Sequence, residues 1–120
     1  MINYTIRSKT KHWPRRTKKI NIRIKKILTY RRDLKFVDNI NYHCNFILAN
    51  DSFIKKINAK YKKIRKPTDV LTFVSYLNFK NKKKEKYCDI IFSIDTILKD
   101  VKKNNVDFYN HLTHLILHSF

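Results

Sequence analysis

Three histidines near the end of the chain have the types and spacing that metal chemistry needs. They are His111, His114 and His118, in the stretch His-Leu-Thr-His-Leu-Ile-Leu-His. A helix turns by about 100° per residue, so the three imidazoles would lie within about 60° of one another on one helix face. Histidines four residues apart, such as His114 and His118, can bind one metal ion. Capped or solvated histidines would show the same spacing, and both interpretations stay open.

A run of basic residues marks the connection between a predicted helix and a predicted strand. Residues 58–73 read Asn-Ala-Lys-Tyr-Lys-Lys-Ile-Arg-Lys-Pro-Thr-Asp-Val-Leu-Thr-Phe. Lys62 and Arg65 stand near the C-terminus of the helix, where cations are favoured. Thr68 or Asp69 can accept hydrogen bonds from backbone donors in the turn. From the residues alone, this stretch is a well-formed connection between a helix and a strand.

The elements that must position these groups follow from hydrophobic periodicity. The predicted order is β-α-β-α-β-β-α-α, an α/β or α+β fold with one sheet and flanking helices in a single domain over residues 1–120. Strands are expected over residues 1–7, 41–49, 70–74 and 87–92. Helices are expected over residues 15–32, from Asn50 or Asp51 to a stop at Pro67, from Ser93 or Asp95 to Asn104-Asn105, and from about Asp107 to the last residue.

The net charge of +19 points to a polyanionic partner. Lys and Arg number 28, against 9 Asp and Glu. Such a surplus favours nucleic acid or an acidic membrane surface, although a genome drifting toward A+T would also supply part of it. Residues 80–86 are expected to form a charged loop. The helix over residues 15–32 is expected to pack on a sheet with its basic face in solvent, in preference to docking on a membrane. Its predicted inner face consists of Ile20, Ile24, Ile27, Leu28 and Arg31.

Glycine is absent, and this excludes several classes of enzyme. A P-loop, a dinucleotide fingerprint and a nucleophile elbow all require glycine, so nucleotide-cofactor enzymes and serine hydrolases are excluded. Cys44 and Cys88 form no C-x-x-C motif and are expected to be small buried residues in a reduced compartment. No apolar run approaches the roughly 20 residues of a membrane span, and no signal peptide is recognisable. We therefore expect a soluble, cytoplasmic protein.

The stretch at residues 58–73 and the histidine stretch occur in an order and spacing that identify a family. Asn58 and Tyr61 precede Pro-Thr-Asp-Val-Leu-Thr-Phe at residues 67–73, and Asp89-Ile90-Ile91 precedes the histidine stretch. This arrangement resembles the YbeY family of bacterial single-strand-specific endoribonucleases and rRNA maturation factors. The resemblance covers roughly residues 46–120 and is weak before them. The Pro-Thr-Asp motif is its most specific part.

The resemblance implies a zinc hydrolase with a small mixed four-stranded sheet flanked by helices, a metalloprotease-like fold. The family holds Zn²⁺ with H-x3-H-x5-H. In that register His118 matches the first ligand, and His114 and His111 match upstream histidines that would be local helpers and not ligands. The metal would activate a water molecule for attack on a phosphodiester.

The resemblance also implies residues that hold RNA. Lys62 stands where the family has a functional Arg, which makes it the candidate catalytic residue, and Lys62, Arg65 and Lys66 would bind the RNA backbone. An ammonium group at this position is a point charge and lacks the bidentate geometry of a guanidinium. Three further positions depart from the family pattern: Arg65 replaces Asp, Val74 replaces Pro and Cys88 replaces Gly.

The chain stops at Ser119-Phe120, before the second and third family ligands. We therefore expect a C-terminally truncated family member. The first functional hypothesis is a zinc-dependent endoribonuclease in rRNA maturation and ribosome quality control, with single-stranded RNA and the ribosome as partners and neither membrane nor DNA. The alternative is a catalytically inactive RNA- or ribosome-binding remnant. A third, weaker hypothesis is metal binding by the three histidines alone.

Overall fold

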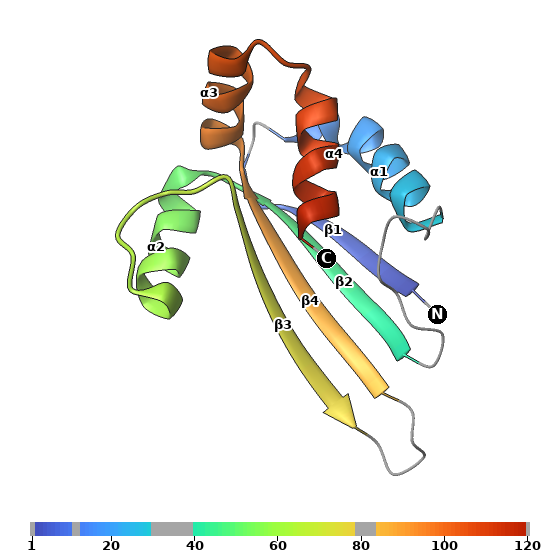
Figure 1. Ribbon diagram of the computed structural model, residues 1–120. Helices are drawn as coiled ribbons and strands as arrows, with labels where there is room; N and C mark the ends of the chain where they lie inside the picture. The colour runs from blue at the N-terminus through green and yellow to red at the C-terminus, as the bar shows by residue number, and fades with distance from the viewer. Residues whose placement is uncertain (1, 11–12, 30–39, 79–83, 120) are drawn as a thin grey trace.

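Four strands and four helices follow one another in this computed structural model, which describes residues 2–10, 13–29, 40–78 and 84–119 (Figure 1). Their order is the order predicted from the hydrophobic pattern. The strands are β1 (Ile2–Ser8), β2 (Ile40–Ala49), β3 (Val70–Asn78) and β4 (Lys84–Ser93). The helices are α1 (Pro14–Thr29), α2 (Asp51–Lys62), α3 (Ile94–Asn104) and α4 (Phe108–His118).

The strands form one mixed sheet in the order β1-β2-β4-β3. β1, β2 and β4 run parallel, whereas β3 pairs antiparallel with β4 and forms one edge. The central strands β2 and β4 end in continuous apolar runs. Such runs are typical of strands that helices cover on both faces. The predicted mixed four-stranded sheet flanked by helices is confirmed.

The sheet separates two layers of helices. On one face, Phe46 and Ile90 belong to the core that packs against α1, α3 and α4. On the other face, Leu71 and Ile91 pack with Ile54 of α2. Successive side chains of a strand point to opposite faces, so α2 lies on the face opposite α1 and α4. Figure 1 shows α2 standing apart from these two helices.

Several predicted boundaries differ from the structure: α2 ends at Lys62, before the predicted stop at Pro67, and β3 continues to Asn78, beyond the predicted end at residue 74. The predicted charged loop over residues 80–86 is wrong at its end, because residues 84–86 belong to β4 and pair with both β2 and β3. Glu85 contributes to this extension, since its Oε2 atom lies 2.8 Å from Nε2 of His43 on β2. Residues 80–83 lie outside the described residues.

Helix α1 begins one residue before its predicted start and is described as far as Thr29. Residues 30–32, including Arg31, lie outside the described residues. Its predicted inner face is confirmed at Ile20, Ile24 and Leu28, all of which are buried.

In the described segments, no helix is long and apolar enough to cross a bilayer.

Cys44 and Cys88 are buried, as predicted, but they are also neighbours. They occupy directly opposite register positions on β2 and β4. The hydrogen bond that the Cys44 thiol donates to Cys88, together with burial, raises the pKa of Cys44. A protonated, buried thiol is a poor nucleophile, so Cys44 acts as a core residue.

The first turns of α2 and α3 meet at a polar junction. Asp51 Oδ1 accepts hydrogen bonds from Ser93 Oγ at 2.5 Å and from Thr96 Oγ1 at 2.6 Å. The Asp51 backbone N–H donates to Asp95 Oδ2 at 3.0 Å. Carboxylates are favoured at helix N-termini. The junction therefore ties together the helices that follow β2 and β4.

Asp51→Ala is expected to lower the free energy of unfolding by about 2–3 kcal/mol, because two charge-assisted hydrogen bonds are lost and the Ser93 hydroxyl stays buried without its acceptor. Urea denaturation followed by circular dichroism measures the loss. Asp89→Ala is the control: it removes the same group from an exposed position, where about 1 kcal/mol or less is expected. Equal losses in the two variants would contradict the structural role of the junction.

Candidate functional site

The end of α2 carries a dense group of exposed basic residues. We call residues 60–66 the basic segment: five of its seven residues are Lys or Arg, and all seven are exposed. The helix ends at Lys62, and Lys63 closes it in the left-handed conformation with φ 57°. This conformation costs a residue with a Cβ atom about 1–2 kcal/mol, and the chain has no glycine to relieve it.

Asn58 fixes the position of the basic segment through hydrogen bonds. Its side chain is 4% exposed, and Nδ2 donates to the Lys66 carbonyl oxygen at 2.9 Å. Its backbone carbonyl accepts from the N–H of Lys63 and, at 3.3 Å, from that of Ile64. One buried residue therefore holds both the start and the end of residues 63–66, which makes Asn58 a positioning residue.

Asn58→Ala is expected to lower the free energy of unfolding by about 1 kcal/mol through the lost hydrogen bond. The freed segment should also bind single-stranded RNA several-fold more weakly, because its charged residues would lose their fixed positions and ordering them on binding would cost entropy. Fluorescence anisotropy at fixed salt measures the affinity. Asn104→Ala, at an exposed position on α3, is the control. Unchanged RNA affinity in Asn58→Ala would show that the segment needs no positioning.

An aromatic groove borders the basic segment. It lies between α2 and the sheet, has a volume of about 360 Å³, and is lined by Ile47, Phe53, Ile57, Tyr61, Phe73, Asp89 and Ile91. Tyr61 is 58% exposed and stands edge-on to Phe73, with ring centroids 5.4 Å apart. Lys60 Nζ lies 5.2 Å from the centre of the Tyr61 ring. Aromatic rings flanked by cations are the groups on which unpaired nucleobases stack.

The Pro-Thr-Asp turn leads from the basic segment into β3. Asp69 Oδ1 accepts from the Val70 N–H at 2.8 Å and from Thr68 Oγ1 at 3.2 Å. The Asp69 carbonyl accepts from the Ser93 N–H at 2.9 Å, which links the turn to the end of β4. These bonds set where the edge strand begins, and they confirm the turn role predicted for Asp69.

The histidine stretch lies on α4, which Asp107 caps by accepting a hydrogen bond from the Asn110 N–H at 3.1 Å. Phe108, Leu112 and Ile116 are buried against the sheet and α1, which leaves His114 and His118 exposed. The rings of these two histidines stack with centroids 6.2 Å apart.

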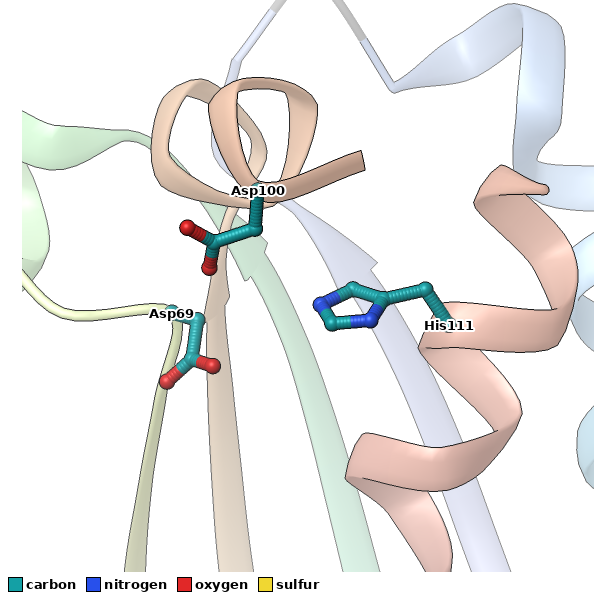
Figure 2. Close-up of side chains that lie close together, drawn as sticks. All are labelled: Asp69, Asp100 and His111. Carbon is teal, nitrogen blue, oxygen red and sulfur yellow. The ribbon is translucent and has the colours of Figure 1, made fainter. Parts of the chain in front are cut away.

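His111 has a different environment from the other two. Its ring nitrogen and one carboxylate oxygen each from Asp69 and Asp100 lie within 4.8 Å of one another. Figure 2 shows the ring pointing from α4 toward the two carboxylates, which come from the start of β3 and from α3. His111 and His118 are separated by about 10 Å along the helix axis, because each residue adds 1.5 Å. One ion cannot bind both.

A family model described as "Endoribonuclease YbeY" matches residues 4–120. The chain belongs to the YbeY family. A YbeY endoribonuclease of Anaplasma phagocytophilum is 35% identical over 89 residues, which are 72% of this chain and 54% of that protein. One of Ehrlichia chaffeensis is 33% identical over 75 residues, or 60% of this chain and 45% of that protein. The chain thus spans about half the length of these relatives.

Two further comparisons cover nearly the whole chain. A YbeY endoribonuclease of Pelagibacter ubique is 26% identical over 121 residues, which are 100% of this chain and 78% of that protein. The solution structure of TM1509 from Thermotoga maritima aligns with a TM-score of 0.61 over 99% of this chain and 69% of that one, at 20% identity. The structural similarity supports the mixed α/β fold.

The residues that the YbeY resemblance singled out fall into two places. Lys62, Arg65 and Lys66 lie together in the basic segment at the end of α2. His114 and His118 lie together on α4, which packs on the opposite face of the sheet. The sheet separates the two places. Tyr61 contacts Phe73 of the edge strand β3.

Sequence reasoning missed two contributors. The strand pattern places Phe73 in a strand and gives it no role, whereas the structure places it in the lining of the groove, in contact with Tyr61. Asp100 lies on α3 with no motif spacing to Asp69 or His111, so the packing of α3 beside α4 is what brings it to them. No signal in the sequence would have found Asp100.

Proposed function

We propose that this YbeY-family chain acts as a zinc-dependent endoribonuclease on single-stranded RNA, in the cytoplasm, in rRNA maturation and ribosome quality control. The observation that carries the proposal is the exposed basic segment beside the aromatic groove, in a chain that matches the family over residues 4–120. The arrangement offers charges for phosphates and rings for bases in one place.

The basic segment would hold the RNA backbone. Lys62, Arg65 and Lys66 are exposed within one short stretch of chain, so we expect them to contact neighbouring phosphates. Tyr61 and Phe73 would receive a base in the groove. Stacking of this kind requires unpaired bases, and the bases of an A-form duplex are already stacked within the helix. The site therefore favours single strands.

Helix α4 would supply a ligand for the metal ion. His118 is exposed on α4, so its imidazole, a donor suited to zinc, faces solvent, and His114 stacks on it from one turn before. When bound, Zn²⁺ supplies a Lewis acid that activates a water molecule. Because the sheet lies between this helix and the basic segment, the RNA strand would pass around the edge of the sheet at β3 to reach both. Lys62 would then neutralise a phosphate near the reacting one.

Cleavage of an end-labelled, unstructured RNA by the protein expressed from its complete gene tests the proposal. We expect cleavage with Zn²⁺, none after chelation, and little cleavage of a matched duplex. Equal rates on the duplex would remove the role given to the groove. Cleavage that persists in chelator would remove the role given to zinc.

A second function is favoured by the charge alone. The chain carries +19, and within the described residues no acidic side chain forms a salt bridge with the basic segment. An RNA- or ribosome-binding protein without catalysis would need only this feature. Salt-sensitive binding of single-stranded RNA without cleavage, in the presence of Zn²⁺, would support this alternative over the nuclease.

A further inference from the structure

We propose that Asp69, Asp100 and His111 form a binding site for a divalent transition-metal ion such as Mn²⁺ or Zn²⁺, separate from the histidines at the end of α4. The three residues come from the start of β3, from α3 and from α4 (Figure 2). The proposal goes beyond the nuclease function and does not depend on it.

The donor atoms are arranged around a gap and are not bonded to one another. They lie within 4.8 Å of one another. Nε2 of His111 is buried and has no hydrogen-bond partner among the described residues. A metal with bonds of about 2.1 Å needs donors about 3.4 Å apart in tetrahedral geometry, so small side-chain rotations would close the gap around an ion. A buried nitrogen without a partner is costly, and a bound ion would remove this cost.

The charges of the site also favour a cation. Two carboxylates that face the same space repel each other unless a positive group lies between them. The chain has 28 Lys and Arg, yet no salt bridge from them to Asp69 or Asp100 is formed within the described part of the chain. The hydrogen bonds of Asp69 from the Val70 N–H and from Thr68 use Oδ1, which leaves Oδ2 for a ligand.

The donor set indicates which ions would bind. Carboxylate oxygens are hard donors and imidazole is a borderline one. A mixed site of two carboxylates and one histidine suits Mn²⁺, Fe²⁺ or Zn²⁺ better than Ca²⁺, which prefers six to eight oxygen ligands. Water would complete the coordination.

The bound ion would act as a clamp on α4. It would join the helix to α3 and to the turn before β3, close to the hydrogen bond between the Asp69 carbonyl and the Ser93 N–H. Its role would be to stabilise the position of the helix that carries His118, without contact with RNA.

The experiment separates this site from the zinc ligand by working in a His118→Ala background. Metal-free His118→Ala protein is titrated with Mn²⁺ by calorimetry, and its thermal unfolding is measured with and without Mn²⁺. We expect saturable binding of one ion and a rise in Tm of about 5 °C at a tenfold excess over Kd. Adding Asp100→Asn, which removes one carboxylate charge from this half-buried group, should weaken binding by at least about tenfold.

Asp89→Asn is the matched control, because it removes the same charge from the opposite face of the sheet. It should leave Mn²⁺ binding unchanged. His111→Gln should weaken binding as Asp100→Asn does, and the effect of both on calorimetry is read only in protein that retains the native circular dichroism spectrum. Absence of Mn²⁺ and Zn²⁺ binding in the His118→Ala background would overturn the proposal. Equal binding in the Asp100→Asn and Asp89→Asn variants would overturn it as well.

Discussion

Replacement of His118 by alanine is expected to abolish zinc-stimulated cleavage of single-stranded RNA while leaving RNA affinity within about twofold. The imidazole is exposed on α4 and is the zinc ligand that we propose from the YbeY resemblance, so its loss should release the metal. Loss of a partner that only supports a metal ligand costs about 10–100-fold. Loss of a ligand should cost at least about 100-fold in cleavage rate. Initial rates at saturating Zn²⁺, with anisotropy for binding, measure both quantities.

His114→Ala is the matched control for this prediction, because His114 lies one turn away, is also exposed and stacks on the His118 ring. As a helper and not a ligand, it should cost less than about tenfold in rate. Equal losses in the two variants would favour shared metal binding by both histidines. Full activity of His118→Ala would remove this residue from the catalytic site.

Removal of the charges at Lys62, Arg65 and Lys66 is expected to have the largest effect on RNA binding. Each phosphate contact on a single strand contributes a slope of about 0.7 in the dependence of log K on log salt. Three contacts therefore account for about two decades, so the triple alanine variant should bind about 100-fold more weakly at 0.1 M salt. Its salt slope should fall by about 2. Anisotropy titrations over a range of salt concentrations measure both values.

The control is a triple alanine variant at Lys18, Lys25 and Lys26, which are exposed on α1. It removes the same charge from a different surface and should reduce affinity only through the net charge, by about threefold or less. If the α1 variant loses as much affinity as the basic-segment variant, RNA binding is a property of the overall charge and has no defined site.

The order and type of the elements could be predicted because each one carries its own periodic pattern. Ile20, Ile24 and Leu28 mark the inner face of α1 without reference to the rest of the chain, and the structure buries them. The register between strands could not be predicted. The neighbouring positions of Cys44 and Cys88 follow from the pairing of β2 with β4, a contact between segments far apart in the sequence.

In the candidate site, too, features set by consecutive residues could be predicted and features set by tertiary contacts could not. The basic segment was predictable because its members are consecutive and belong to one motif. The spacing of the three histidines correctly placed them on one helix, yet it did not show that His111 faces Asp69 and Asp100. That contact depends on how α3 and α4 pack beside the start of β3, and side-chain direction of this kind is set by tertiary structure.

Cleavage of an RNA stem–loop with a long unpaired loop decides whether the protein is a zinc-dependent nuclease for single strands, because one substrate offers paired and unpaired strands at the same concentration. The protein expressed from its complete gene is incubated with this RNA and Zn²⁺, and the products are mapped on a denaturing gel beside those of the His118→Ala variant. We expect cuts confined to the loop in the wild type and none in the variant. Cuts in the stem, or an identical pattern in the variant, would contradict this expectation.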